Sequence, residues 1–179
     1  MNKLFIPALL AILLAACSST PPAGDTGAPV ETRTPTGQIK PINTDSVTTS
    51  GLPRELTDSA SPLAKRLVYF DLDKYDIKDE YKELVAAHAR FLSANRNFKV
   101  LIQGHTDARG SREYNLALGQ KRADAVRKSL GLLGVREEQI ESVSFGKEKP
   151  AVEGQDESAW SQNRRAHILY KGPTGAGEF

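Results

Sequence analysis

Residues 98–134 read FKVLIQGHTDARGSREYNLALGQKRADAVRKSLGLLG and decide the fold. Residues 98–103 are mostly apolar and predict a strand, and the glycine-bounded stretch 104–110 predicts a loop. Helical spacing then runs from about residue 112 to 132, and Gly134 is expected to end that helix. Its predicted inward face comprises Leu116, Ala123, Val126, Leu130 and Leu133. The segment therefore predicts a helix packed against a sheet.

Shorter patterns on either side complete the predicted domain. Further strands are expected at 67–70, 140–145 and 166–170, and further helices at about 81–92 and 158–164. Because strands and helices alternate, we expect an α+β fold with two layers, a mixed sheet of about four strands with helices on one face. The 179 residues, 39% of them hydrophobic, have room for one modest core. A formal net charge of +2 gives no reason to expect nucleic acid as a partner.

The first residues have the features of a secretion signal. The apolar run 4–14 is well short of the roughly 20 residues that cross a bilayer as a helix. Residues 14–17, Leu-Ala-Ala-Cys, resemble the bacterial lipobox, and Cys17 is the only cysteine in the sequence. We therefore expect 1–16 to be a lipoprotein signal peptide and Cys17 to carry acyl chains such as palmitate. By the same resemblance, Ser18 implies passage to the outer membrane.

A change of composition separates this terminus from the domain. Between 18 and 62 there is no aromatic residue, and seven of the ten prolines fall there. Such a composition buries too little apolar surface to offset chain entropy, so residues 17–64 are expected to form a lipidated N-terminus and a disordered linker. The folded domain is expected at 65–171. The tail 172–179 is assigned no role.

Arg122 stands out on the long helix. It lies at the edge of the predicted apolar stripe, on the same flank as Asn115 and Leu118, where a guanidinium would be partly sheltered. A sheltered arginine needs an anion. That anion is either Asp107 or Asp124 in a salt bridge, or the carboxylate of a ligand.

Asp107 sits where a strand gives way to a loop, a common place for a binding side chain. Asp107 and Arg122 together are suited to a zwitterion, because a carboxylate takes an ammonium and a guanidinium takes a carboxylate. A diamino-dicarboxylic acid such as meso-diaminopimelate matches both. Backbone amides of the loops 71–76 and 104–110 are expected to add donors.

Two stretches, 104–110 and 114–126, resemble the OmpA-like peptidoglycan-binding domain family. The family pattern Asn-x-x-Leu-x-x-x-Arg-Ala-x-x-Val is met by Asn115, Leu118, Arg122, Ala123 and Val126. More narrowly, the chain resembles the peptidoglycan-associated lipoproteins of that family at 68–70, 73–77, 144–152 and 163–166. The resemblance covers about residues 65–171.

The resemblance implies roles for particular residues. Asp107 and Arg122 would hold the two ends of the diaminopimelate side chain, and the turn at Asp73 would form the other wall of the pocket. The residues implied to line or brace it are Thr106, Asn115 and Leu118. Two positions depart from many members of the family, Ala108 in place of an acidic residue and His105 in place of asparagine. Neither belongs to the proposed pair of charges.

The resemblance also implies a function. A member of this family would tether the outer membrane to peptidoglycan without covalent bonds, as part of the Tol-Pal system that serves cell division and envelope integrity. Its partners would be the meso-diaminopimelate stem peptide, the outer membrane through the lipid, and the β-propeller protein TolB. The domain itself would lie in the periplasm. No cofactor is expected.

Two other functions are compatible with parts of the sequence. The first is a protein-interaction module for a Tol-system partner, with wall contact incidental. The second is a metal-dependent peptidoglycan hydrolase, in which His105 and Asp107 would be metal ligands with His88 as a third. Such sites need three convergent protein ligands, whereas His88 belongs to a helix stripe and is more simply a half-buried core residue. A non-catalytic protein is therefore expected.

Overall fold

The computed structural model describes residues 51–179. The signal peptide predicted at 1–16, the lipidation of Cys17 and the first part of the linker lie outside the described residues. Within 51–179, no helix combines the length and the apolar character that crossing a membrane requires.

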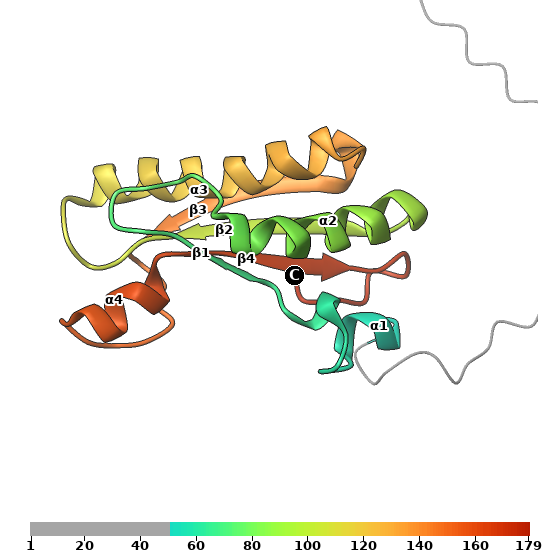
Figure 1. Ribbon diagram of the computed structural model, residues 1–179, viewed down its shortest axis with the longest axis horizontal. Coiled ribbons are helices and arrows are strands. Elements are labelled where there is room, and N and C mark those ends of the chain that lie inside the picture. The colour runs from blue at the N-terminus through green and yellow to red at the C-terminus, as the bar shows by residue number, and fades with distance from the viewer. Residues whose placement is uncertain (1–50) are drawn as a thin grey trace, which may run out of the picture. The chain divides into compact units, whose positions relative to one another are not determined.

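The domain is built on one four-stranded sheet with the order β1-β4-β2-β3 (Figure 1). The edge strand β1 and the central strand β2 are both antiparallel to β4, and β2 is parallel to β3. The strands are β1 (Leu67–Tyr69), β2 (Lys99–His105), β3 (Ile140–Gly146) and β4 (Arg165–Lys171). The predicted mixed sheet of four strands is confirmed.

Two long helices, α2 (Asp79–Ala94) and α3 (Arg112–Leu132), cover the same face of this sheet (Figure 1). Helix α4 (Glu157–Asn163) lies at one end of the sheet, and the short α1 (Arg54–Thr57) lies at the other. Two 3-10 turns, η2 (Pro62–Ala64) and η3 (Glu137–Gln139), complete the elements. The expected α+β arrangement with the long helices on one face is confirmed.

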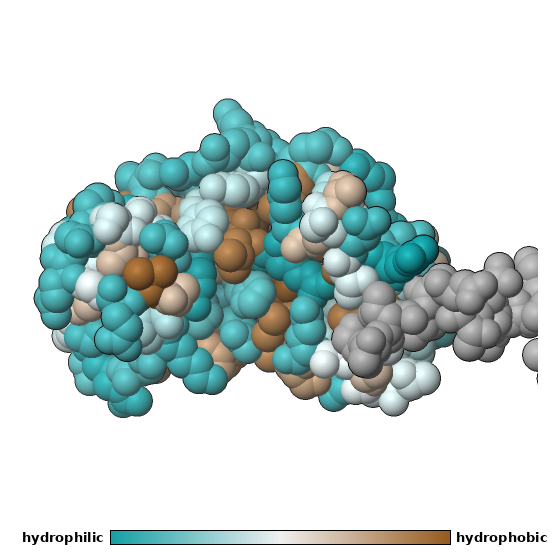
Figure 2. Space-filling view, turned by 90° about the horizontal axis from the view of Figure 1, so that it is seen from below, coloured by the Kyte–Doolittle hydropathy of each residue, from teal (hydrophilic) through white to brown (hydrophobic). Residues whose placement is uncertain are grey.

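The core lies between the sheet and these helices. Alternate residues of β2 and β4 are fully buried, whereas Leu101 and its register partner Leu169 are only half-buried on the other face. Figure 2 views the molecule from below Figure 1 and shows apolar side chains across the middle of this face, flanked by hydrophilic ones. The buried side chains include Val85, Leu92, Val100, Ile102, Val126, Leu130, Ile168 and Tyr170.

The inward face of α3 differs from the prediction. Leu116 and Leu133 were expected to face the core, but they are 47% and 49% exposed. The buried side instead follows the flank that carries Arg122. It consists of Asn115, Leu118, Gly119, Arg122, Ala123, Val126 and Leu130. The prediction is thus confirmed for Ala123, Val126 and Leu130 and wrong for Leu116 and Leu133, because the sheet meets the helix at a glycine.

That glycine contact sets the distance between α3 and the sheet. A Cβ on Gly104 of β2 would collide with the backbone carbonyl of Gly119 in α3, and a Cβ on Gly119 would collide with Ser144 of β3. The missing side chains let the backbones of helix and strand touch. This close approach carries the first turns of α3 to the end of β2, where the candidate site lies.

Residues 51–64 are folded, although their composition placed them in the linker. Leu52, Leu56 and Leu63 are buried in the core. The two prolines of this stretch precede or begin short helical turns, which is a position that proline favours. The linker therefore ends earlier than residue 64.

The tail 172–179 folds back along β4. Gly172 N–H donates to the Ala176 carbonyl at 2.7 Å, and the Glu178 carboxylate pairs with Arg66 and accepts the Tyr170 N–H. Gly51 and Ala176 lie in contact, so both ends of the folded domain meet near the C-terminal end of β4.

His88 is a fully buried core residue rather than a half-buried one. Its Nε2 lies 2.9 Å from the Lys65 carbonyl, which only accepts, so Nε2 carries the proton and Nδ1 accepts the Tyr170 hydroxyl at 2.7 Å. Burial lowers the pKa of His88 to about 4. The imidazole is therefore neutral and joins α2 to β4.

Gly104→Ala is expected to lower the free energy of unfolding by about 2 kcal/mol or more, because its Cβ forces α3 away from the sheet. Gly131→Ala in the same helix is the matched control, since nothing lies within 4 Å of its added Cβ. It should be neutral or stabilising by up to about 1 kcal/mol. Urea unfolding measures both, and equal effects of the two substitutions would contradict the close approach.

The free energy of unfolding is expected to decrease as the pH is lowered from about 6.5 to about 4. The folded His88 stays neutral there while the unfolded chain binds a proton, so the free energy of unfolding decreases by about 3 kcal/mol. His105, whose pKa burial lowers to about 3, acts in the same direction. His88→Gln should flatten the curve of unfolding free energy against pH in this window. Identical slopes for wild type and variant would refute this assignment.

Candidate functional site

A pocket of about 140 Å³ opens at the C-terminal end of β2. The loop 71–76 forms one side, and the loop after β2 with the first turns of α3 forms the other. The lining residues are Leu72, Asp73, Thr106, Asp107, Arg109, Gly110, Tyr114, Asn115, Leu118 and Arg122. All six residues that the sequence nominated for wall binding lie around this one pocket.

The loop after β2 is held by backbone bonds and by one side chain of α3. Thr106 N–H donates to the Gly146 carbonyl at 2.9 Å, which fixes the loop to the end of β3. The Ser111 hydroxyl caps α3 by accepting the Tyr114 N–H at 3.1 Å. The Asn115 amide donates to the carbonyls of Arg109 and Ser111 at 2.6 and 3.0 Å. Asn115 therefore braces the loop.

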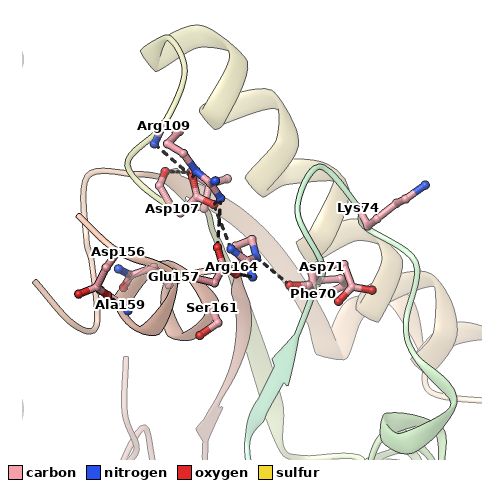
Figure 3. Close-up of polar contacts among 12 residues, drawn as sticks. Phe70, Asp71, Lys74, Asp107, Arg109, Asp156, Glu157, Ala159, Ser161 and Arg164 are labelled. Carbon is pink, nitrogen blue, oxygen red and sulfur yellow. Dashed lines mark hydrogen bonds and ion pairs between the residues drawn. The ribbon is translucent and has the colours of Figure 1, made fainter. Parts of the chain in front are cut away.

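Asp107 is buried and has arginine partners (Figure 3). Arg109 donates to it from Nε at 3.2 Å and from Nη2 at 2.7 Å, and Arg164 donates from Nη1 at 3.4 Å. Burial, the largest influence, raises the pKa of Asp107, but the hydrogen bonds from Arg109 help to bring it below its ordinary value. Asp107 is therefore ionised at neutral pH.

Arg122 is 0% exposed and donates to three backbone carbonyls. The acceptors are Asp71 at 3.0 Å, Lys74 at 2.8 Å and His105 at 2.9 Å. Burial lowers the pKa of Arg122 to about 10, so it remains a cation at neutral pH. Of its five N–H groups, two have no acceptor among residues 51–179.

The salt-bridge alternative for Arg122 is wrong. Asp107 is paired with Arg109 and Arg164, and Asp124 contacts Gln120, Ser142 and Arg127. The reason is geometric, because the guanidinium donates to carbonyls of the loop 71–76 and of the last residue of β2, and to neither carboxylate. It follows that Arg122 is sheltered without a paired anion among the described side chains.

Asp73 forms the opposite rim. It has a φ of 56°, a left-handed conformation that aspartate tolerates better than most residues, and it accepts a hydrogen bond from the Tyr114 hydroxyl. That bond joins the loop 71–76 to α3 across the mouth of the pocket. Leu72 and Tyr114 are exposed beside it.

Sequence reasoning missed Arg109 and Arg164 as partners of Asp107. The Asp-x-Arg spacing at 107–109 is a local signal, since both groups lie in one loop. Arg164 is 57 residues away from Asp107, so only the fold brings them together. The pocket lining holds two arginines, Arg109 and Arg122, against two carboxylates, Asp73 and Asp107, so its formal charges balance.

The histidines of the hydrolase alternative do not meet in a metal site. His88 is bonded within the core, and His105 stacks on Phe145 with ring centroids 5.7 Å apart. Burial is the main cause that lowers the pKa of His105 to about 3. Across residues 51–179, no three His, Cys, Asp or Glu side chains are grouped so that they would hold a metal ion.

Comparison with known proteins gives one consistent family. Residues 69–164 match the model described as the OmpA family. The chain is 54% identical over 103 residues to the peptidoglycan-associated lipoprotein of Pasteurella multocida, covering 58% of this chain and 69% of that protein. It is 40% identical over 169 residues to the protein of that name from Legionella pneumophila, covering 94% of each. These names describe an envelope protein and not an enzyme, in agreement with the non-catalytic prediction.

Solved structures agree with the sequence relatives. The peptidoglycan-associated lipoprotein of Burkholderia pseudomallei matches with a TM-score of 0.65 and 56% identity, covering 65% of this chain and 99% of that chain. The C-terminal domain of Helicobacter pylori MotB matches with a TM-score of 0.56 at 19% identity, covering 60% and 84%. The second likeness concerns the fold alone.

Replacing the Arg122 side chain should destabilise the domain as well as alter the pocket. Arg122→Met leaves three carbonyls without their donor, and we expect a loss of about 3 kcal/mol or more in the free energy of unfolding. Arg112→Met, which removes an exposed arginine paired with Glu148, should change it by less than about 1 kcal/mol. Chemical denaturation of both variants is the test. Similar values would show that the three bonds contribute little.

Proposed function

This chain belongs to the OmpA family, among the peptidoglycan-associated lipoproteins, and we propose that it tethers the outer membrane to peptidoglycan. In this proposal the pocket binds the diaminopimelate of wall stem peptides without a covalent bond. Asp107 takes the ammonium of the ligand and Arg122 takes its carboxylate. Asp73, Thr106, Asn115 and Leu118 line or brace the pocket.

The observation that carries the proposal is the arrangement of charges around one small pocket. A buried carboxylate and a buried guanidinium with two unused N–H groups both line it, and neither is paired with the other. The free end of meso-diaminopimelate carries an ammonium and a carboxylate on one carbon. A charge-assisted hydrogen bond to each is stronger than a neutral one. The pocket volume suits one such side-chain end rather than a larger group.

The same charges predict discrimination between wall types. Lysine, which replaces diaminopimelate in some walls, has the ammonium but not the second carboxylate. With lysine bound, the two unused N–H groups of Arg122 would stay unpaired in a buried position, which is unfavourable. The proposed ligand is therefore the diaminopimelate stem peptide.

The rest of the tether is proposed from the sequence. Acyl chains on Cys17 anchor the protein in the outer membrane, and residues 18–50 connect that anchor to the domain. The domain receives the chain at Gly51, near the C-terminal end of β4, whereas the pocket lies at the opposite end of the sheet. This polarity supports a domain that faces the wall from the periplasmic side of the membrane.

A Tol-system partner is a second component of the proposal. Four large apolar or aromatic side chains, Leu72, Tyr75, Tyr114 and Leu116, are exposed, and two of them line the pocket. Exposed aromatic and aliphatic groups of this kind are enriched in protein interfaces. We propose that a TolB-like protein binds over this rim, so that partner binding and wall binding compete. Such competition would link the tether to the Tol-Pal system and cell division.

Asp107→Asn is expected to weaken binding of the purified protein to diaminopimelate-containing sacculi at least about tenfold, because the ammonium loses its charged acceptor. Glu83→Gln, which removes an exposed carboxylate paired with Arg90, is the matched control and should bind like wild type. Co-sedimentation with sacculi provides the measurement. Sacculi that contain lysine should bind wild type as weakly as the Asp107 variant binds diaminopimelate walls.

Unchanged sacculus binding by Asp107→Asn would contradict the pocket. If wild type captures purified TolB-like protein but sacculi of neither type, the interaction-module alternative replaces wall binding.

A further inference from the structure

Asp107 already has a full set of hydrogen bonds within the domain (Figure 3). Its Oδ1 accepts the backbone N–H of Arg109 at 3.1 Å and the Nε of Arg109 at 3.2 Å. Its Oδ2 accepts Nη2 of Arg109 at 2.7 Å and Nη1 of Arg164 at 3.4 Å. A carboxylate offers about four lone-pair positions. An incoming ammonium must therefore displace one of these donors.

The two arginines are held very differently. The Arg164 side chain is 7% exposed and also donates to the Phe70 carbonyl and to Glu157. The Arg109 side chain is 36% exposed, belongs to a loop, and lines the pocket, which Arg164 does not. Removing the buried Arg164 would leave further buried groups unpaired, whereas Arg109 can move into solvent. Arg109 is therefore the donor that an incoming ammonium would displace from Asp107.

Two other groups contact Arg109. Its guanidinium lies over the Trp160 ring, 4.0 Å from the centroid. Its Nη2 is also 3.9 Å from Oε2 of Glu157, an exposed carboxylate of α4. Arg109 therefore has a second anion within reach when it leaves Asp107.

We propose that Arg109 guards the ammonium position of the pocket, and that a ligand ammonium replaces it on Asp107 while Arg109 moves to Glu157. The exchange conserves charge, because one cation leaves Asp107 as another arrives. This inference rests on the proposed function, since it concerns the same pocket and the same ligand end.

The guard has consequences for affinity and selectivity. Only the fraction of molecules with Arg109 displaced offers Asp107 to the ligand, so the apparent Kd is the intrinsic Kd divided by that fraction. A ligand without a cation cannot take the place of Arg109 and gains nothing from Asp107. Competition from Arg109 thus keeps wall binding reversible and makes it selective for ligands with a free amine.

Trp160 reports the exchange, because it is the only tryptophan in the sequence and it contacts Arg109. The purified protein is titrated with the tripeptide L-Ala-γ-D-Glu-meso-diaminopimelate while Trp160 emission and binding heat are recorded. We expect saturable binding with a change in emission. The same peptide acetylated only on the side-chain amine of diaminopimelate should bind more weakly and leave the emission unchanged.

Variants separate a guard from a ligand contact. Arg109→Gln should bind the tripeptide about three- to tenfold more tightly, because the competing ion pair is gone, and its emission should no longer respond. Arg109→Lys keeps the charge but not the paired N–H donors. Its affinity for the tripeptide should lie between those of wild type and Arg109→Gln. Arg112→Gln, an exposed arginine paired with Glu148, is the control and should match wild type.

Two results would overturn the guard while leaving the proposed function intact. One is tripeptide binding by wild type with no change in Trp160 emission. The other is equal or weaker binding by Arg109→Gln, which would make Arg109 a bystander or a ligand contact. Absence of any tripeptide binding by calorimetry would instead remove the proposed function, and the guard with it.

Discussion

The buried guanidinium of Arg122 is the interaction on which the site depends. It comes from α3 and joins the loop 71–76 to the end of β2, through carbonyls at Asp71, Lys74 and His105. Those bonds fix both walls of the pocket relative to the helix. Because a guanidinium has five donors, the same group can hold the walls and still present N–H groups to a ligand. A lysine in its place would supply neither the reach nor the number of donors.

The fold supplies the position of that guanidinium. The close contact of Gly104 with Gly119 brings α3 onto the sheet one turn before Arg122, so the side chain enters the space above the end of β2. Asp107 lies two residues after that strand and accepts a hydrogen bond from Arg164, which stands between α4 and β4. Thus each of the two charges proposed to bind the wall is held by backbone geometry and by a second buried contact.

Much of this was predictable from sequence. Periodicity located the four strands and α3, and the family pattern selected residues that share one pocket. The predictions that failed concern residues whose surroundings depend on contacts between parts of the chain that are far apart in sequence. Leu116 and Leu133 were placed inward because apolarity alone cannot reveal where glycines let a sheet approach. The leucines within 51–64 find their partners only in the assembled core, and Arg164 reaches Asp107 only through sheet pairing.

In the proposed mode of binding, opposite charges on the loop after β2 and on α3 together recognise one zwitterionic end of the wall peptide. A crystal structure of the protein with a diaminopimelate-containing stem peptide tests it most directly. We expect the ligand ammonium within hydrogen-bonding distance of Asp107 and the adjacent carboxylate on Arg122. A peptide seated elsewhere, or one in the pocket that touches neither charge, would contradict it.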